Sequence, residues 1–257
     1  MVAVALTIAG SDPSGGAGIQ ADLKTFHRFG VYGEAAITLL TVQNTEKVSR
    51  VEVLARELVR AQVEAVISDI PPGAAKTGAL GNSEIIKTIA ELSTQFAFPL
   101  VVDPVMISKH GSRLVTEGAI DAFKQQLLPR AALVTPNIPE AEALSGLAIH
   151  SQDDMLPAAA RILGQGCKAV LIKGGHLTGE PVDFLHSAEI SHFFHFPRIP
   201  TPHTHGTGCT YSAAITALLA LGRPLDRAVS EARRFVQRAI QTGPALGHGN
   251  GPLNHFA

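Results

Sequence analysis

The segment His205-Gly-Thr-Gly-Cys-Thr210 stands just ahead of an apolar run over residues 212–221, which is typical of a buried helix. Glycines at the start of a helix let backbone N–H groups converge, and the aligned peptide dipoles add about half a positive charge there. Gly206, Thr207 and Gly208 are therefore predicted to form an anion hole suited to phosphate or an oxyanion. The alternative is a tight turn in which the threonine caps the helix.

Cys209 falls within the first turn of the same predicted helix. The pKa of a thiol falls at a helix N-terminus, so this position favours a thiolate near neutral pH. A buried, unreactive thiol is the default for any cysteine, and the sequence leaves the two states of Cys209 equally open. Cys167, beside a predicted strand, is expected to pack in the core.

Three charged residues have the chemistry that phosphoryl transfer needs, which is positioning and neutralisation of charge. Asp103 and Glu140 offer the oxygen ligands that Mg²⁺ prefers, here through water. Asn137-Ile-Pro-Glu140 fits a helix cap equally well, with Asn137 at the cap and an acid three residues later. Lys173 precedes two glycines and can point at a phosphate oxygen, although a lone lysine at a strand end is commonly just solvated.

A first glycine-rich stretch, Gly10-Ser-Asp-Pro-Ser-Gly-Gly-Ala-Gly18, precedes another helical pattern. It matches the dinucleotide fingerprint only loosely and lacks the Lys-Ser/Thr of a P-loop, so a flexible connection is the alternative. His203 and His205 resemble a metal pair, but no third ligand is evident and a polar loop is favoured. No Gly-x-Ser-x-Gly elbow supports a hydrolase triad.

Short β-branched runs alternate with amphipathic ones along the chain. The runs predict buried strands over residues 2–9, 35–42, 73–76, 100–102, 132–134 and 169–172. Apolar residues at helical spacing predict helices over residues 19–26, 58–67, 85–90 and 228–240. Residues 182–196 alternate differently and predict an antiparallel hairpin at an edge of the sheet. The fold class is therefore α/β, with a mostly parallel sheet covered by helices on both faces.

Polar residues follow each predicted parallel strand. The six segments are Gly10-Ser-Asp12, Gln43-Asn44, Lys76-Thr-Gly78, Asp103-Pro104, Thr135-Pro-Asn137 and Lys173-Gly-Gly175. The carboxyl ends of parallel strands share one edge, and open α/β sheets bind ligands along it. The sequence therefore predicts one composite small-molecule site, against the plainer interpretation that loops are polar.

Composition narrows the function further. The chain has 257 residues and a net charge of −1, so no basic field attracts nucleic acid or an anionic membrane. Two cysteines exclude a disulfide scaffold and a four-thiolate zinc site. No signal peptide or membrane span is evident, and no linker or repeat divides the chain. We expect a cytoplasmic protein with a single domain over residues 1–257.

Taken together, the motifs resemble the ribokinase-like superfamily and, more closely, its hydroxymethylpyrimidine/phosphomethylpyrimidine kinases of thiamine biosynthesis. The resemblance covers nearly the whole chain. Seven motifs carry it in order: Thr7–Lys24, Gln43-Asn-Thr45, Asp103-Pro-Val-Met106, Thr135-Pro-Asn-x-Pro-Glu140, Lys173-Gly-Gly-His176, Thr204-His-Gly-Thr-Gly-Cys-Thr210 and Gly251-Pro-x-x-His255. It implies a three-layer α/β/α sandwich and an ATP- and Mg²⁺-dependent kinase. The implied acceptors are 4-amino-5-hydroxymethyl-2-methylpyrimidine and its monophosphate, and the implied assembly is a homodimer.

The resemblance also implies roles for particular residues. Gly10, Asp12, Gln43 and Val105 would form the substrate pocket, and Gln43 offers a donor and an acceptor together to the pyrimidine edge. Residues 206–209 would form the anion hole, with Lys173 on the γ-phosphate, Asp103 and Glu140 near the metal, and Cys209 as the base.

Two departures and two alternatives accompany this interpretation. Cys209 stands where ribokinase relatives carry an Asp base, and Ala79 stands where the family often has Met. The alternatives are a pyridoxal kinase of the same Cys-type branch and a nucleotide-binding module without catalysis. Residues 109–112 are suggested as a mobile flap over the site.

Overall fold

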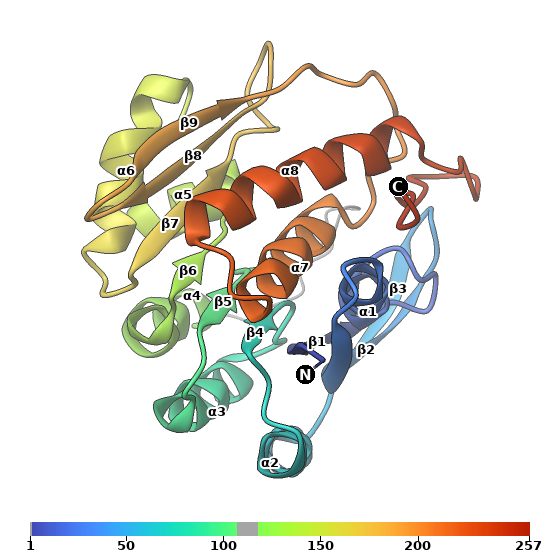
Figure 1. Ribbon diagram of the computed structural model, residues 1–257, viewed down its shortest axis with the longest axis vertical. Helices are drawn as coiled ribbons and strands as arrows, with labels where there is room; N and C mark the ends of the chain where they lie inside the picture. Colours follow the sequence, from blue (N-terminus) through green and yellow to red (C-terminus); the bar gives the residue numbers. More distant parts are fainter. Residues whose placement is uncertain (1, 107–117) are drawn as a thin grey trace.

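Within residues 2–106 and 118–257, which the computed structural model of the protein describes, nine strands form one sheet. Their order is β3-β2-β1-β4-β5-β6-β7-β8-β9 (Figure 1). The suggested flap at residues 109–112 lies outside the described residues. Only the first three strands depart from chain order. They run in reverse, so β1 is the third strand from one edge and lies beside β4.

The central strands of this sheet are parallel. They are β1 (Val4–Ser11), β2 (Tyr32–Gln43), β4 (Ala74–Thr77), β5 (Leu100–Val102), β6 (Leu133–Val134) and β7 (Ala169–Lys173). Each overlaps one of the runs predicted as a buried strand, so the α/β fold with a mostly parallel sheet is confirmed. Short β-branched runs suit β1 and β4 to β7, whose residues are nearly all buried because helices cover both faces there.

Antiparallel strands complete both edges. The predicted hairpin is confirmed as β8 (Val182–Ser187) and β9 (Ser191–His195), with β8 paired to β7. At the opposite edge β3 (Val48–Val53) pairs with β2. β3 was not predicted from the sequence; none of its residues is buried, and Ser, Arg and Glu stand between its valines.

Helices cover the two faces of the sheet (Figure 1). One face carries α2 (Arg56–Asp69), α3 (Ser83–Leu92), α4 (Ala119–Ala122), α5 (Ile138–Ser145) and α6 (Met155–Leu163). The other carries α1 (Gly18–Arg28), α7 (Thr207–Ala220) and α8 (Leu225–Gln241). Short helical turns at Ser93–Gln95, Phe123–Leu127, Leu128–Arg130 and Gln152–Asp154 join these elements. The three-layer arrangement implied by the resemblance is therefore present.

Alternate residues of each central strand enter different cores. Val102, Val134 and Ile172 pack against the α2–α6 face, whereas their neighbours Val101, Leu133 and Leu171 pack toward α7 and α8. This period of two is the reason that the strands lack a polar face. In the described parts of the chain no helix has the length and apolar character needed to cross a bilayer.

Helix α7 packs against β1 and β4 of the sheet and against the two helices α1 and α8 (Figure 1). Its residues 210–218 are all buried, which explains why the run 212–221 has no polar side. A helix that is apolar all round must be covered all round. Because α7 is held on every side, its N-terminus is a fixed point at the carboxyl edge of the sheet.

A buried ion pair joins the helix layer to the sheet beneath this edge. Lys76 Nζ of β4 lies 2.9 and 2.8 Å from the two carboxylate oxygens of Asp22 on α1, and both side chains are fully buried. The Thr7 hydroxyl donates to Asp22 Oδ2 at 2.6 Å. Burial of a charge without a partner is costly, so each member of this cluster requires the others.

We expect Lys76→Met to lower the free energy of unfolding by about 3–5 kcal/mol, because it leaves the Asp22 carboxylate buried without its cation. Urea denaturation measures the change. The matched control is Arg50→Met, which removes a 2.7 Å pair with Glu52 whose side chains are 70% and 57% exposed. That control should cost less than about 1 kcal/mol. Equal losses in the two variants would contradict the role assigned to the buried pair.

Candidate active site

A cavity of about 1160 Å³ opens at the carboxyl edge of the parallel strands. All eleven residues that the sequence analysis assigned to a site line it: Gly10, Asp12, Gln43, Asp103, Val105, Glu140, Lys173, Gly206, Thr207, Gly208 and Cys209. Ser11, Gly78 and Asn137 line it too, so each of the six strand-end segments contributes a residue. The expected composite site therefore exists as one continuous space.

The N-terminus of α7 forms one wall of the cavity. Gly206 has φ +78°, and a Cβ there would lie 1.8 Å from the Gly16 carbonyl oxygen, so only glycine fits this approach. No side chain caps the helix, and the Thr207 hydroxyl instead donates to the Thr204 carbonyl oxygen at 2.8 Å. The capping alternative is therefore wrong, and the uncapped N-terminus faces the cavity as an anion site requires.

Lys173 lies directly beneath this helix N-terminus. Its Nζ is 2.9 Å from Asp103 Oδ1, and a Cβ on Gly208 would lie 3.2 Å from the same Nζ. Burial disfavours the charged ammonium, but the attraction of Asp103 and Glu140 outweighs it and raises the pKa of Lys173. The side chain is 14% exposed, so Lys173 is a fixed cation of the site rather than a solvated surface lysine.

Asp103 is held on three sides by protein donors. Its Oδ1 accepts from Lys173 and from the Thr135 hydroxyl at 3.1 Å, and its Oδ2 accepts from the Ser212 hydroxyl at 3.2 Å. Burial opposes ionisation, but the charges of Lys173 and Lys76 outweigh it and hold the pKa of Asp103 below its usual value. Asp103 is therefore an ionised carboxylate in a buried setting.

Glu140 forms the capping box of α5 with Asn137. Its Oε2 accepts from the Asn137 N–H at 2.8 Å, and Asn137 Oδ1 accepts from the Glu140 N–H at 2.9 Å. Burial raises the pKa of Glu140 to about 7, and the repulsion of Asp103 adds to this effect while Lys173 opposes it. The helix-capping role is thus present, and a metal role must coexist with it.

The carboxylates fit a hydrated cation better than a directly coordinated one. Asp103 has three protein donors on its two oxygens, and one oxygen of Glu140 is taken by the Asn137 amide. Across the residues that the structure describes, no group of three His, Cys, Asp or Glu side chains is placed to hold a metal. A carboxylate has about four acceptor positions, so each still has room for metal-bound water.

Of the two states of Cys209 that the sequence leaves open, the structure favours the protonated thiol. Burial raises the pKa of the Cys209 thiol to about 11, although the Lys76 charge and the Gly18 amide act in the opposite direction. The side chain lies in the first turn of α7, but loss of hydration outweighs the helix dipole there. The thiol is therefore protonated at neutral pH. Burial also raises the pKa of Cys167, to about 12, as expected for a core cysteine.

Asp12 organises the loop that follows β1 at the cavity. Its Oδ1 accepts from the Ser14 N–H at 2.9 Å and the Ser14 hydroxyl at 2.7 Å, and its Oδ2 accepts from the Ala17 N–H at 2.9 Å. The glycine-rich stretch is therefore an ordered loop around a carboxylate, not a flexible connection. Gly10 packs against β2, where a Cβ would lie 2.5 Å from a Leu39 methyl group.

His205 is the residue that the sequence analysis undervalued. It is 3% exposed, and its Nε2 lies 2.7 Å from Asp12 Oδ2 and 3.1 Å from Gln43 Nε2. The neighbouring His203 instead accepts from the Gly251 N–H at 3.2 Å through Nδ1. The two histidines are thus no metal pair. The signal in the sequence was the position of His205 directly before the anion hole.

A buried ion pair that the sequence did not reveal, Arg233 with Asp183, also lines the cavity. Arg233 Nε lies 3.2 Å from Asp183 Oδ2, and its guanidinium lies 3.9 Å from the centre of the Phe196 ring. Asp183 Oδ1 also accepts from the Gly174 N–H at 3.1 Å. This cluster ties the β8–β9 hairpin to α8, and Asp183 and Arg233 line the cavity.

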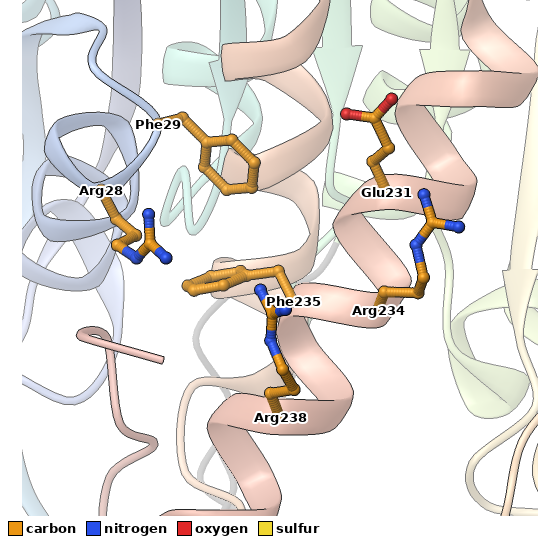
Figure 2. A pocket seen from close by; sticks show the side chains of 6 residues that line it. All are labelled: Arg28, Phe29, Glu231, Arg234, Phe235 and Arg238. Carbon is orange, nitrogen blue, oxygen red and sulfur yellow. The ribbon is translucent and has the colours of Figure 1, made fainter.

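A smaller cavity of about 260 Å³ lies between the end of α1 and α8 (Figure 2). Three arginines line it with Glu231 around the edge-to-face pair Phe29 and Phe235, whose centres are 5.2 Å apart. The arginines are Arg28, Arg234 and Arg238, all exposed. None of the predicted site residues lines this cavity, so the chemistry belongs to the larger one.

Comparisons with known proteins agree with this site. Residues 12–254 match the family described as phosphomethylpyrimidine kinase. The chain is 48% identical to the hydroxymethylpyrimidine/phosphomethylpyrimidine kinase of Haemophilus influenzae, covering 98% of this chain and 96% of that protein. It is also 48% identical to the thiamine biosynthesis bifunctional protein ThiED of Geobacter sulfurreducens, over 98% of this chain but only 52% of that protein.

Among solved structures, the pyridoxal kinase from Staphylococcus aureus in complex with ADP is similar throughout. The TM-score is 0.93 at 39% identity, covering 100% of this chain and 94% of that one. In that structure a protein of this fold is bound to ADP.

The raised pKa of Cys209 predicts a slow thiol. At pH 7.5 a pKa of about 11 leaves roughly 300-fold less thiolate than an ordinary cysteine with a pKa near 8.5. Alkylation by iodoacetamide, followed by mass spectrometry in a Cys167→Ala background, should therefore be slow at pH 7.5 and accelerate as the pH rises. Labelling at the rate of a free small-molecule thiol at pH 7.5 would contradict the protonated state.

Proposed function

This chain belongs to the phosphomethylpyrimidine kinase family, and on that premise we propose how its cavity performs the reaction. The protein is a hydroxymethylpyrimidine/phosphomethylpyrimidine kinase of thiamine biosynthesis that transfers a phosphoryl group from ATP. One observation carries the assignment of roles: the acceptor residues Asp12 and Gln43 line the same cavity as the α7 N-terminus. A migrating phosphoryl group needs both within reach of each other.

The acceptor alcohol occupies the half of the cavity between β1 and β2. Gln43 pairs with the amino group and ring nitrogen of the pyrimidine, while Gly10 and Val105 supply walls. Asp12 acts indirectly, because four protein donors, including His205, already occupy its carboxylate. Its task is to hold the loop that shapes the pocket.

The nucleotide occupies the opposite half. Its terminal phosphates lie at the amides of residues 206–209 and against the Lys173 ammonium, where charge on the migrating group is stabilised. The base and sugar extend toward the apolar wall made by Ile199, Val236 and Ile240. A phosphoryl group between the two halves is then in line with the acceptor hydroxyl.

Magnesium belongs to this proposal through water. Asp103 and Glu140 would hold water molecules of the hydrated cation, with α5 and the strand β5 fixing the two carboxylates. When bound, the ion would neutralise the charge of the phosphate oxygens. The positive charge of Lys173 offsets part of the negative charge of the two carboxylates and the phosphates. Its raised pKa keeps Lys173 protonated in this position.

Cys209 accepts the proton of the substrate hydroxyl in this scheme. Only its minor thiolate population can do so, because the pKa is about 11. Proton transfer comes late in a loose phosphoryl-transfer transition state, when the hydroxyl has become acidic. A second phosphorylation uses the same groups, with the monophosphate as acceptor.

The proposal has three further points, which rest on the resemblance to the family. The chain forms a single kinase domain over residues 1–257, it assembles as a homodimer, and it is located in the cytoplasm. Pyridoxal kinase is the less favoured function. The chain is 48% identical to a pyrimidine kinase and 39% identical to a pyridoxal kinase, which supports the pyrimidine as the acceptor. Selectivity between these two heteroaromatic alcohols depends on only a few pocket contacts.

An ATP-coupled assay with three acceptors tests the function directly. We expect ADP release with the pyrimidine alcohol and with its monophosphate, and a lower kcat/KM for pyridoxal. ADP release with pyridoxal alone would reverse the assignment. Nucleotide binding by calorimetry with no turnover of any acceptor would indicate a binding module.

Cys209→Ala should lower kcat by about 10²–10⁴-fold with little change in the Kd of ATP, because a base acts on the transition state. With a pKa of about 11, the thiolate population grows with pH, so kcat of the unaltered enzyme should rise about tenfold per unit between pH 7 and 9. The variant should lose this slope, whereas Cys167→Ala should keep it. An unchanged kcat in Cys209→Ala would remove the cysteine from the mechanism.

A further inference from the structure

The His205 ring lies at the junction of three segments that are distant in sequence. Its Nε2 contacts Asp12 of the glycine-rich loop and Gln43 at the end of β2. Its backbone N–H donates to the Gly251 carbonyl oxygen at 3.1 Å, and a Cβ on Gly16 would lie 2.5 Å from its ring. These contacts leave the ring one orientation.

The partner at Asp12 determines which atom of the ring carries hydrogen. Burial opposes the charge of Asp12, but hydrogen bonds from His205 and Ser14 outweigh it and hold the pKa of Asp12 below its usual value. An ionised carboxylate only accepts hydrogen bonds. The 2.7 Å contact with Asp12 Oδ2 therefore requires a hydrogen on His205 Nε2.

This hydrogen constrains the amide of Gln43. The Gln43 amide atom that lies 3.1 Å from His205 Nε2 must accept the hydrogen bond from this N–H. If that atom were the amide nitrogen, its own N–H would face the N–H of His205 and neither could accept. A rotation of the amide by half a turn exchanges its oxygen and nitrogen in place. The stable orientation is the one with Oε1 toward His205, sharing the hydrogen with Asp12 in a three-centre bond.

The orientation of Gln43 determines what it recognises. With Oε1 fixed beside His205, the amide NH₂ and the second lone pair of Oε1 remain for a ligand in the cavity that Gln43 lines. That pattern complements an amino group next to an unprotonated ring nitrogen, as in the aminopyrimidine. It opposes a carbonyl next to a ring N–H, which would need the amide reversed.

We propose that His205 is a positioning residue that fixes the Gln43 amide and so selects heterocycles with an amino group beside a ring nitrogen. The inference rests on the proposed function and deepens it, because it names the group that sets acceptor specificity. His205 touches neither the transferred phosphoryl group nor the hydroxyl in this scheme. Its effect passes through Gln43.

The test compares two acceptors in one assay. One is the aminopyrimidine alcohol, and the other is its 4-oxo analogue, in which a carbonyl and a ring N–H replace the amino group and the ring nitrogen. We expect the unaltered enzyme to favour the amino compound in kcat/KM by at least about tenfold. His205→Leu should reduce this preference to about threefold or less, because the amide is then free to rotate.

Four variants separate positioning from a structural role. His205→Gln keeps an N–H donor and should retain the preference, and His203→Leu, two residues away, should leave it unchanged. Gln43→Ala should abolish it, and His205→Leu in that background should change it no further. An unaltered preference in His205→Leu, or an additive double variant, would overturn the proposal.

A measurement on the unaltered protein stands apart from turnover. NMR of protein with ¹⁵N-labelled histidine should show a hydrogen on Nε2 of His205, assigned from the sequential backbone resonances of the unaltered protein. An unprotonated Nε2 would overturn the proposal even if the variants fail to fold. Failure of the unaltered enzyme to phosphorylate the aminopyrimidine would instead count against the proposed function, so the two failures are distinguishable.

Discussion

The contact between His205 and Asp12 connects the two halves of the cavity. The Asp12 carboxylate gathers the loop that follows β1, and the residue after His205 is Gly206, where α7 begins. One hydrogen bond of 2.7 Å therefore joins the loop that follows β1 to the start of α7, the two segments that the proposed function assigns to the acceptor and to the phosphates. Because α7 is enclosed by the sheet, α1 and α8, the separation of these segments cannot relax by movement of the helix. Phosphoryl transfer depends on such fixed separation.

Charge at the floor of the cavity and directly beneath it is arranged in compensating pairs. Lys76 lies against Asp22 and Lys173 against Asp103, all of them buried or nearly so. The pairs are close to neutral, so they leave little net positive charge for a polyphosphate. The hydrated cation of the proposed scheme would supply that charge. The same burial raises the pKa of the Cys209 thiol to about 11, because the attraction of Lys76 offsets only part of the lost hydration and Asp22 and Asp103 oppose the thiolate.

The sequence predicted the elements that have a local period. The parallel strands and the stripe of α8 were foreseen because burial imposes a spacing of two or 3.6 residues. The edge strand β3 was not foreseen because none of its residues is buried. The helix α6 was missed although Met155, Ala158, Ala159 and Ile162 recur at helical spacing and form its buried face. The cavity residues were foreseen because the carboxyl ends of parallel strands must share an edge.

The state of Cys209 and the place of His205 depend on contacts across the chain, and no local pattern contains them. A helix N-terminus alone would lower the pKa of Cys209, and only the surrounding packing reverses that direction. His205 acquires its partners from residues 193 and 162 positions away. The sequence could therefore locate the site more readily than it could state the protonation of its members.

The similarity to a pyridoxal kinase separates what the fold determines from what the pocket determines. A sheet edge, a helix N-terminus and a paired lysine serve any acceptor alcohol, since they act on the phosphate that all such reactions share. Choice of acceptor must come from groups that touch the ring. At this edge those groups are few, and the amide of Gln43 has both a donor and an acceptor to offer. An amide free to rotate would accept either pattern of donors and acceptors, so selectivity requires something that fixes its orientation. The buried His205 ring, held by the Asp12 carboxylate, meets this requirement. Reversal of the Gln43 amide would leave an amide N–H facing the ring without an acceptor, in a place where no water can take the acceptor's role.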